Sequence, residues 1–365
     1  MYSVNYLINH HHKCCKCFCS VVVVFWVFVC VFCGGGFCFF VVVFVCFCGI
    51  NLSFLVYWCC LKGYCMSYDL EELEKFRLSG RVLCAAREEM RGYVREGMSV
   101  LEVCERAEEI IRVKGGVPAF PCNVSVNDVA AHYTSPPGDV SVIPVGSTVK
   151  VDMGVHVDGY VTDTAFTVSF NAEGRSMTVT AERALKAVID NIHDDMSTGR
   201  IGGVIETVIR NHGFKPISNL TGHSVGRYLI HAGTSIPNVA SLATNKVHTG
   251  DIFAVEPFVT QPDAIARVDD SPQKTIFRLV RAKSVKNTYA KQLLKHIETN
   301  FHTLPFAERW LTDIVPKAHY AEAFKELLQS KIVTSYPVFV EASKRPVAQA
   351  EHTLLIKKDE CEVLT

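Results

Sequence analysis

The fold is decided by a stretch near the middle of the chain, VKVDMGVHVDGYVTDTAFTVSF (residues 149–170). From Val149 to Val157 apolar residues alternate with polar ones, a period of two that predicts a half-buried β-strand. Asp158-Gly159 favours a two-residue hairpin turn. Tyr160–Phe170 supplies the returning strand, so we expect an antiparallel hairpin.

The register of this hairpin brings two carboxylates together. If the residues that flank the turn pair with each other, Asp152 lies opposite Ala165 and Asp163 lies opposite Gly154. Both acids then share one face in diagonal positions, with Cα atoms roughly 7–8 Å apart. Such a pair could hold cations beside the glycine. Two solvated acids on an exposed strand face are the alternative, and the pair alone does not decide between them.

Three further residues have the character of metal ligands. His223 follows a glycine, Glu256 lies in the apolar stretch FAVEP, and Glu351 lies in VAQAEHT. Glutamates in strands are usually edge residues, and buried ones are uncommon unless they are paired or bind metal. Together with the hairpin acids they form a set of hard oxygen donors and one nitrogen. That set suits a pair of divalent ions such as Mn, Fe, Co or Zn.

Composition divides the chain near Met66. Residues 1–65 hold 12 of the 16 cysteines, three lysines, no arginine and no acid, whereas residues 66–365 hold 34 basic and 37 acidic residues, a charge of about −3. This mild negative charge argues against nucleic-acid binding through a basic surface. Four scattered cysteines argue against a disulfide scaffold and suit a reducing cytosol. The 300 residues are enough for one or two domains.

The first 65 residues allow two interpretations. Residues 17–49 contain only Phe, Val, Cys, Trp and Gly, apart from Ser20. As protein, the apolar runs Cys17–Cys33 and Phe37–Cys60 predict a membrane hairpin with both ends in the cytoplasm. The same residue types are those that codons made of G and T encode. We favour this second interpretation, a mis-assigned start with the true one at Met66, and expect no part of the catalytic fold in residues 1–65.

Residues 66–365 show a mixed pattern of helices and short strands. Predicted helices cover Leu70–Glu96, Ser99 to the Gly115-Gly116 stop, Thr178–Asn191 and Gly203–His212; predicted strands lie around Ile252–Pro257, Val347–His352 and Leu354–Lys357; and a helical block between about 289 and 336 contains Gln292–Asn300, Ala307–Ile314 and Tyr320–Ser330.

An ordered set of short motifs resembles the methionine aminopeptidases of the M24 peptidase family, specifically the type 2 enzymes of the archaeal kind. The motifs are PAFP (118–121), AHYT (131–134), VDMGVHVDG (151–159), TDTA (162–165), GHS (222–224), IHAG (230–233), VEPF (255–258) and AEHT (350–353). Each motif alone is weak, but their order and spacing match over essentially all of residues 66–365. TLPF (303–306) resembles part of the helical insertion of type 2 enzymes.

The resemblance implies an α+β "pita-bread" fold, a curved antiparallel sheet flanked by helices, with residues 66–365 as the catalytic domain and the insertion at about 289–336. It implies two divalent metal ions (Co, Mn, Fe or Zn) that activate a water molecule for attack on the scissile carbonyl. The ligands carried over are Asp152, Asp163, His223, Glu256 and Glu351, with Asp163 and Glu351 bridging the ions.

The resemblance also assigns roles around the metal site. Glu256 is implied as the proton shuttle, and His132 and His231 as the groups that hold the scissile peptide and stabilise the tetrahedral intermediate. Phe120 and Ile230 match residues of the methionine side-chain pocket. Without the resemblance, core packing is an alternative account of Phe120, and a buried structural histidine is the default account of His231.

The implied activity is removal of the N-terminal methionine from nascent proteins in the cytoplasm, by a monomer. We expect a contact with the ribosome, although no residue in the sequence identifies it. We expect no specific nucleic-acid partner, and membrane association only if residues 1–65 are part of the expressed protein. One alternative is a peptidase of the same fold that cleaves before proline, which the AHYT context and the insertion oppose. Another is a non-catalytic ribosome- or nucleic-acid-binding relative, which five competent ligand positions oppose.

Overall fold

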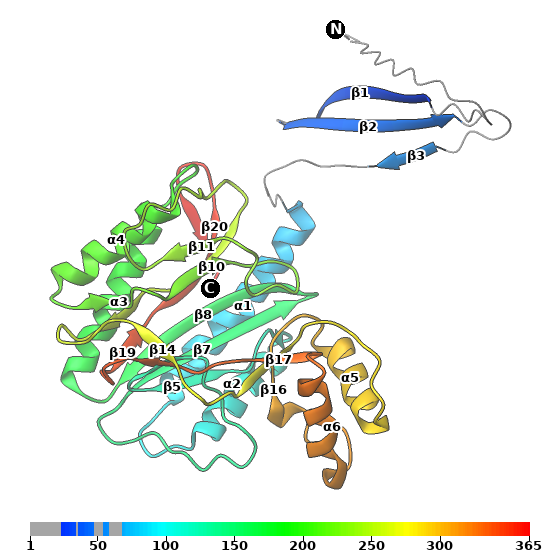
Figure 1. The fold of residues 1–365 in the computed structure, drawn as a ribbon. Helices are drawn as coiled ribbons and strands as arrows, with labels where there is room; N and C mark the ends of the chain where they lie inside the picture. Colours follow the sequence, from blue (N-terminus) through cyan, green and yellow to red (C-terminus); the bar gives the residue numbers. More distant parts are fainter. Residues whose placement is uncertain (1–22, 34–35, 47–53, 58–67) are drawn as a thin grey trace. The chain divides into compact units, whose positions relative to one another are not determined.

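The computed structural model describes residues 23–33, 36–46, 54–57 and 68–365 (Figure 1). Contacts divide the chain into two units, Met1–Cys65 and Met66–Thr365. In the first, β1 (Val23–Cys33) pairs antiparallel with β2 (Gly36–Cys46), which pairs with β3 (Phe54–Tyr57). The two predicted membrane spans lie partly outside the described residues, as does the predicted start at Met66.

Among the residues that the structure describes, no helix combines the length and the apolar character needed to cross a bilayer.

The helices of the second unit are α1 (Leu70–Tyr93), α2 (Val100–Val113), α3 (Ala172–Ile189), α4 (Thr198–Asn211), α5 (Thr288–Asn300) and α6 (Lys317–Gln329). Four of them, α1, α3, α4 and α5, begin at polar side chains that cap their first turns. Asn171 and Ser197 accept hydrogen bonds from the first turns of α3 and α4. Both helices therefore start earlier than their apolar periodicity predicts. The predicted end of the first helix at Glu96 is wrong, because Val94 is already extended.

A nine-stranded antiparallel sheet forms the centre of the unit. Its strands are β4 (Val117–Pro118), β5 (Asn123–Val126), β7 (Thr148–Val157), β8 (Tyr160–Ser169), β10 (Thr221–Ser224), β11 (Ser235–Pro237), β12 (Ile252–Val255), β20 (Glu351–Ile356) and β21 (Cys361–Val363). The order is β11-β10-β12-β20-β8-β7-β4, with β21 on β20 and β5 on β7. The predicted hairpin is confirmed: β7 and β8 pair from Val157↔Tyr160 outward. The predicted α+β class is confirmed as well.

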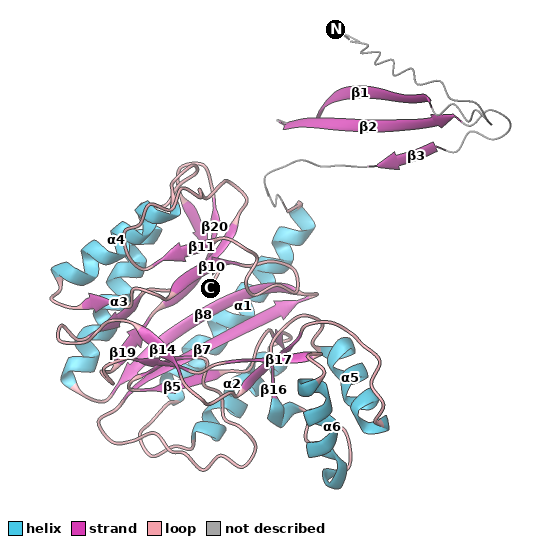
Figure 2. Ribbon diagram, viewed as in Figure 1, coloured by secondary structure: helices cyan, strands magenta, loops and turns pink. Residues whose placement is uncertain are grey.

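Two helical pairs cover the sheet, as Figure 2 shows. Helices α1 and α2 pack on the apolar side chains of β7, among them Val151 and Met153. Helices α3 and α4 pack on β12 and β20, where Phe253 and Leu354 are buried. The prediction that β7 is half-buried is wrong, because its polar face is also covered. Lys150 on that face is 1% exposed and donates to two backbone carbonyls.

One predicted strand is divided between two sheets, and another ends where the chain changes sheet. The predicted strand Val347–His352 consists of β19 (Val347–Gln349) followed by the start of β20. The predicted strand Ile252–Pro257 forms a strand only over β12, after which the chain enters a second sheet as β13 (Phe258–Thr260). β13 pairs with β19 and with β9 (Lys215–Pro216) in a separate sheet. Glu256 lies between β12 and β13, and Glu351 begins β20. A third small sheet contains β14 (Val268–Asp270), β18 (Phe339–Glu341) and β6 (Val129–Ala131).

The predicted insertion, together with a strand that precedes it, forms a small layer with a core of its own. The strands β15 (Ile276–Leu279), β16 (Phe306–Ala307) and β17 (Val333–Tyr336) form a sheet, and α5 and α6 pack beside it (Figure 1). The predicted helix Ala307–Ile314 is wrong, since only Glu308–Trp310 forms a 3₁₀ turn. Ala307 pairs with Ile276 instead of joining a helix.

Candidate active site

The central hairpin places its two carboxylates on one face. Asp152 lies opposite Ala165, and Asp163 lies opposite Gly154. The glycine is required by close packing, because a Cβ at position 154 would lie 2.2 Å from Cε1 of Phe120. The ring of Phe120 can therefore lie directly over the hairpin, next to the acids.

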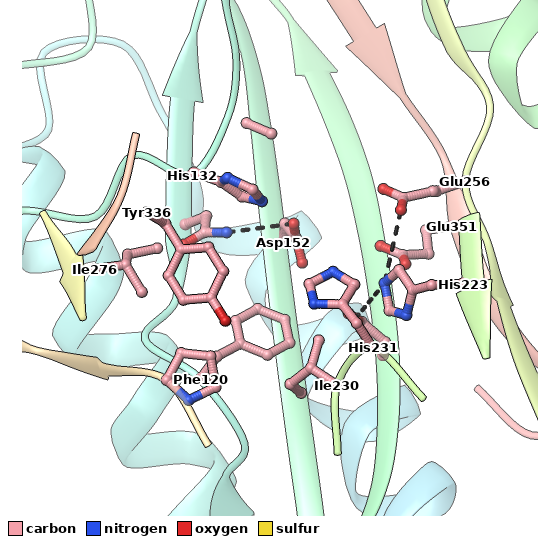
Figure 3. A pocket seen from close by; sticks show the side chains of 14 residues that line it. Phe120, His132, Asp152, His223, Ile230, His231, Glu256, Ile276, Tyr336 and Glu351 are labelled. Atoms are coloured by element: carbon pink, nitrogen blue, oxygen red, sulfur yellow. Dashed lines mark hydrogen bonds and ion pairs between the residues drawn. The ribbon is translucent and has the colours of Figure 1, made fainter. Parts of the chain in front are cut away.

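Neighbouring strands bring three more ligand candidates to the same face. Glu351 on β20 pairs with Ala165, so it lies across from Asp152 on the other side of β8. His223 on β10 pairs with Ala254, two residues before Glu256. The Nε2 atom of His223 lies 3.7 Å from a carboxylate oxygen of Asp163. It also lies 3.7 Å from one of Glu256, a contact marked by a dashed line in Figure 3.

The ligand atoms converge closely enough for a metal ion. One atom each from Asp163, His223 and Glu351 lie within 4.8 Å of one another. Burial raises the pKa of Asp152 to about 7. Burial, and then the neighbouring carboxylates, raise the pKa values of Asp163 and Glu351 well above their usual range. These groups repel one another when ionised, and divalent cations would offset that repulsion.

Unpaired carboxylate oxygens are a second, independent indication of a metal site. The buried atoms Asp152 Oδ1, Asp163 Oδ1 and Glu351 Oε1 have no hydrogen-bond partner among the described residues. Buried polar atoms are almost always paired, so three orphaned oxygens facing one space indicate a missing partner. The residues present therefore fit a site for divalent metal ions.

Two histidines lie beside the carboxylates on the same pocket. His132 has a φ of 65°, a left-handed conformation that is uncommon outside glycine and often found at functional sites. Burial lowers its pKa to about 4, so its ring is neutral at neutral pH. The ring of His231 lies 4.4 Å from that of His223. Burial, and then the charge of Arg278, lower the pKa of His231.

All nine site residues predicted from the sequence line one pocket. Its lining comprises Phe120, Asn123, Ala131, His132, Asp152, Asp163, His223, Ile230, His231, Glu256, Ile276, Pro305, Tyr336 and Glu351. In Figure 3, Ile276 and Tyr336 lie on the side opposite Glu256 and Glu351. Proximity does not test the individual roles, which stay predictions.

Several residues in and around this pocket were not among the predicted ones. Pro305 and Tyr336 come from the insertion and Ile276 from β15, which pairs with it, and none of the three has a chemical signature in the sequence. Asn123 donates to Asp152 Oδ2 at 3.4 Å. Gln349 donates to Glu256 Oε2 at 3.1 Å. Because it stands two residues before Glu351, the alternation of side chains along an extended chain would have predicted that it lies on the same face as that ligand.

Sequence relatives match nearly the whole second unit. The family model of "Metallopeptidase family M24" matches residues 74–358. A methionine aminopeptidase of Methanothermobacter thermautotrophicus is 42% identical over 299 residues, which cover 81% of this chain and 99% of that protein. A methionine aminopeptidase of Methanocaldococcus jannaschii is 38% identical, with 81% and 99% covered.

Solved structures show the same fold at lower identity. A methionine aminopeptidase from Thermotoga maritima superposes with a TM-score of 0.59 at 21% identity, covering 82% of this chain and 98% of that one. A thermophilic Arx1 gives a TM-score of 0.69 at 15% identity, with 82% and 91% covered. A prolidase from Pyrococcus furiosus gives 0.53 at 16%, with 82% and 65% covered. These likenesses confirm the pita-bread fold.

The family expected from the motifs is thus confirmed by relatives that are matched over nearly their whole length. The sequence matches favour the aminopeptidase interpretation over the proline-specific and non-catalytic alternatives. The chain belongs to metallopeptidase family M24 and, within it, to the methionine aminopeptidases.

Proposed function

We propose that this protein removes the N-terminal methionine from polypeptides by metal-dependent hydrolysis, as a type 2 enzyme. The observation that carries the proposal is a group of four carboxylates and one imidazole at one side of a partly apolar pocket, with Asp163, His223 and Glu351 buried and the other two carboxylates half-buried. The archaeal relatives and the insertion that forms one wall of the pocket support the type 2 assignment.

The cations would be held by Asp152, Asp163, His223, Glu256 and Glu351. Four carboxylates offer more oxygen donors than one ion needs, which supports two ions, and the mixture of oxygen with one nitrogen is compatible with Co, Mn, Fe or Zn. When bound, such ions lower the pKa of water and polarise the scissile carbonyl.

The side chain of Glu256 is suited to move the proton. Gln349 holds its Oε2, while its Oε1 faces His223 at 3.7 Å. A carboxylate fixed in this way can accept a proton from the attacking water and give it to the leaving amine. Its location inside the pocket puts it within reach of both groups.

The two pocket histidines supply hydrogen bonds to the peptide group. His132 and His231 are neutral near pH 7, because burial lowers the pKa of each. A neutral imidazole can donate to the carbonyl oxygen as negative charge develops on it. The side chain of the first residue then lies against Phe120 and Ile230, an apolar surface that suits an unbranched thioether.

The cellular setting extends this proposal. Cys84, Cys104, Cys122 and Cys361 are free thiols, which a reducing cytoplasm maintains. Newly made polypeptides are the substrates there, a ribosome contact would bring the enzyme to them, and a monomer is sufficient because one chain supplies all pocket residues.

Peptide hydrolysis tests the proposal directly. The metal-loaded enzyme should release methionine from Met-Ala-Ser and leave Ala-Pro peptides essentially intact. Faster cleavage of the proline peptide would show that the specificity is that of the alternative peptidase. Absence of hydrolysis with Co, Mn, Fe and Zn each supplied would refute the enzymatic proposal.

A further inference from the structure

A groove between β15 and the end of the insertion carries positive charge next to the active site. It runs beside β15 and β17, and Lys274, Arg278, Arg281 and Lys331 line it, all four exposed. No acidic side chain is among the described residues that line the groove, and none of the four cations forms an ion pair within the described part of the chain. Residues 66–365 carry about −3 overall, so this local excess is not a general property of the surface.

The groove continues from the mouth of the active-site pocket. Ile276 and Tyr336, which pair across β15 and β17, both line the pocket. The pair two positions further along the strands is Arg278↔Thr334, on the same face and roughly 7 Å away. The guanidinium carbon of Arg278 lies 5.9 Å from the centroid of the Tyr336 ring. Arg278 therefore lies where the pocket ends and the groove begins.

The substrate itself is the occupant that this arrangement fits. The pocket takes the first residue, and the rest of an extended polypeptide leaves it at about 3.3–3.6 Å per residue. We propose that Arg278, with Lys274, Arg281 and Lys331 beyond it, forms a subsite for acidic side chains at the third to fifth positions of the substrate. This inference rests on the aminopeptidase function proposed above.

An RNA strand fits the groove less well than a polypeptide does. Single-stranded nucleic acid is bound by exposed aromatic rings on which bases stack. The aromatic residue of the groove, Phe277, is only 5% exposed, whereas Val280 is 48% exposed and Thr334 and Ser335 offer hydroxyl groups. Apolar surface, hydroxyls and unpaired cations together suit an acidic polypeptide.

The subsite can be tested by comparing the hydrolysis of two matched peptides by the full-length, metal-loaded enzyme. We expect kcat/KM for Met-Ala-Glu-Glu-Gly to exceed that for the isosteric Met-Ala-Gln-Gln-Gly by about three- to fivefold at low salt, the ratio that one or two exposed ion pairs produce. The difference should lie mainly in KM, and about 0.5 M salt should reduce it strongly by screening.

Variants of Arg278 assign the preference to the groove. Arg278→Gln should bring the ratio of the two peptides close to one, Arg278→Lys should preserve most of it, and Arg278→Glu should reverse it. The matched control is Arg200→Gln, an exposed arginine on α4 without an ion pair among the described residues, which should keep the wild-type ratio. Because the two peptides are compared within each variant, an effect of the substitution on Tyr336 changes both kcat/KM values alike and cancels from their ratio.

Three results would overturn the subsite. Equal kcat/KM values for the two peptides at low salt would do so, and so would an undiminished preference in Arg278→Glu. Binding of single-stranded RNA that Arg278→Glu abolishes, with no peptide preference in the wild type, would assign the groove to RNA instead. Hydrolysis of neither peptide refutes the proposed aminopeptidase function and the subsite with it, whereas hydrolysis of both at equal rates refutes the subsite alone.

Discussion

Gln349 donates a hydrogen bond from Nε2 to Glu256 Oε2 over 3.1 Å, and the same nitrogen lies 3.5 Å from Glu351 Oε2. The amide is 1% exposed, so it fixes two proposed ligands where water cannot replace it. Gln349→Ala should weaken metal binding by about 10–100-fold, the usual effect of losing a group that orients ligands. Titration calorimetry with Mn²⁺ measures this, and exposed Gln329→Ala is the control. Unchanged affinity in Gln349→Ala would contradict the role.

Removing one charge from the ligand group should abolish hydrolysis without unfolding the protein. Asp163→Asn and Glu351→Gln keep the shape of each side chain and lower the repulsion among buried carboxylates, so thermal stability without metal should stay equal or rise. Turnover of Met-Ala-Ser should fall by at least about 10³-fold. Asp313→Asn and Glu322→Gln are exposed controls. Near-wild-type turnover in either ligand variant, with metal added, would refute the assignment.

Adding one methyl group at Gly154 should disturb substrate binding. The new Cβ would lie 2.2 Å from Cε1 of Phe120, so the ring must leave its place in the pocket. We expect Gly154→Ala to raise KM for Met-Ala-Ser by about tenfold or more, since small misplacements of a binding group are costly. The matched change Gly203→Ala places its Cβ at an ordinary 3.6 Å and should leave KM unaltered. Equal KM values in the two variants would show that the position of the Phe120 ring does not matter for substrate binding.

A buried ion pair attaches the insertion to α2. Glu108 is 2% exposed and accepts hydrogen bonds from Arg309 and, at 2.8 Å, from Trp310 Nε1. Arg309→Ala leaves the carboxylate with only the half-exposed Arg112, 3.8 Å away, as a cationic partner. Loss of the buried partner should lower the free energy of unfolding by about 3 kcal/mol. Chemical denaturation measures this. Adding Glu108→Gln should recover part of the loss, because no buried charge then remains. A double variant less stable than Arg309→Ala would contradict this account.

Stability should depend on pH through Glu341. Burial raises the pKa of this carboxyl, but hydrogen bonds from Ala266 N, Ser343 N and Oγ, and Arg345 N together outweigh it and hold the pKa below its usual value. The stabilisation is therefore complete above the unfolded-state pKa of about 4.3 and is lost as pH falls through the lower folded-state value.

The Glu341→Gln variant isolates this effect. We expect it to be less stable than the wild type at pH 7, and the difference in unfolding free energy should shrink as pH falls below about 4.3. Denaturant titrations from pH 7 to pH 3 measure it, on the metal-free protein so that ligand binding does not contribute. A difference that stays constant over this range would exclude ionised Glu341 as the cause.

Local chemistry explains which parts of the fold the sequence could predict. The hairpin register follows from Asp158-Gly159 and the alternation around it, and the structure has the predicted pairs. The junctions at Glu256 and Ala350 could not be predicted, because an apolar run shows that a strand is buried and not which sheet it joins. The failed helix at Ala307–Ile314 has a similar cause, since strand pairing with Ile276 outweighs a local helical pattern.

The same distinction holds for the pocket. Aspartate, glutamate and histidine within apolar stretches are conspicuous, so candidates such as His223 and Glu351 could be identified from the sequence alone. Ile276 and Tyr336 are ordinary strand residues whose place beside the site depends on how the insertion docks. Arg278 stands in no motif at all, and only the pairing of β15 with β17 reveals that it borders the pocket.

The pocket has two walls of different origin, with consequences for inhibitor selectivity. A compound that only chelates metal would engage the carboxylates of the central sheet and could not discriminate between this enzyme and other peptidases with the same ligands. A compound that also fills the space against Ile276, Pro305 and Tyr336 would contact β15 and the insertion, which supply none of the proposed metal ligands. Selective inhibitors should therefore be elaborated toward that wall, and an acidic substituent directed at Arg278 would extend them into the groove.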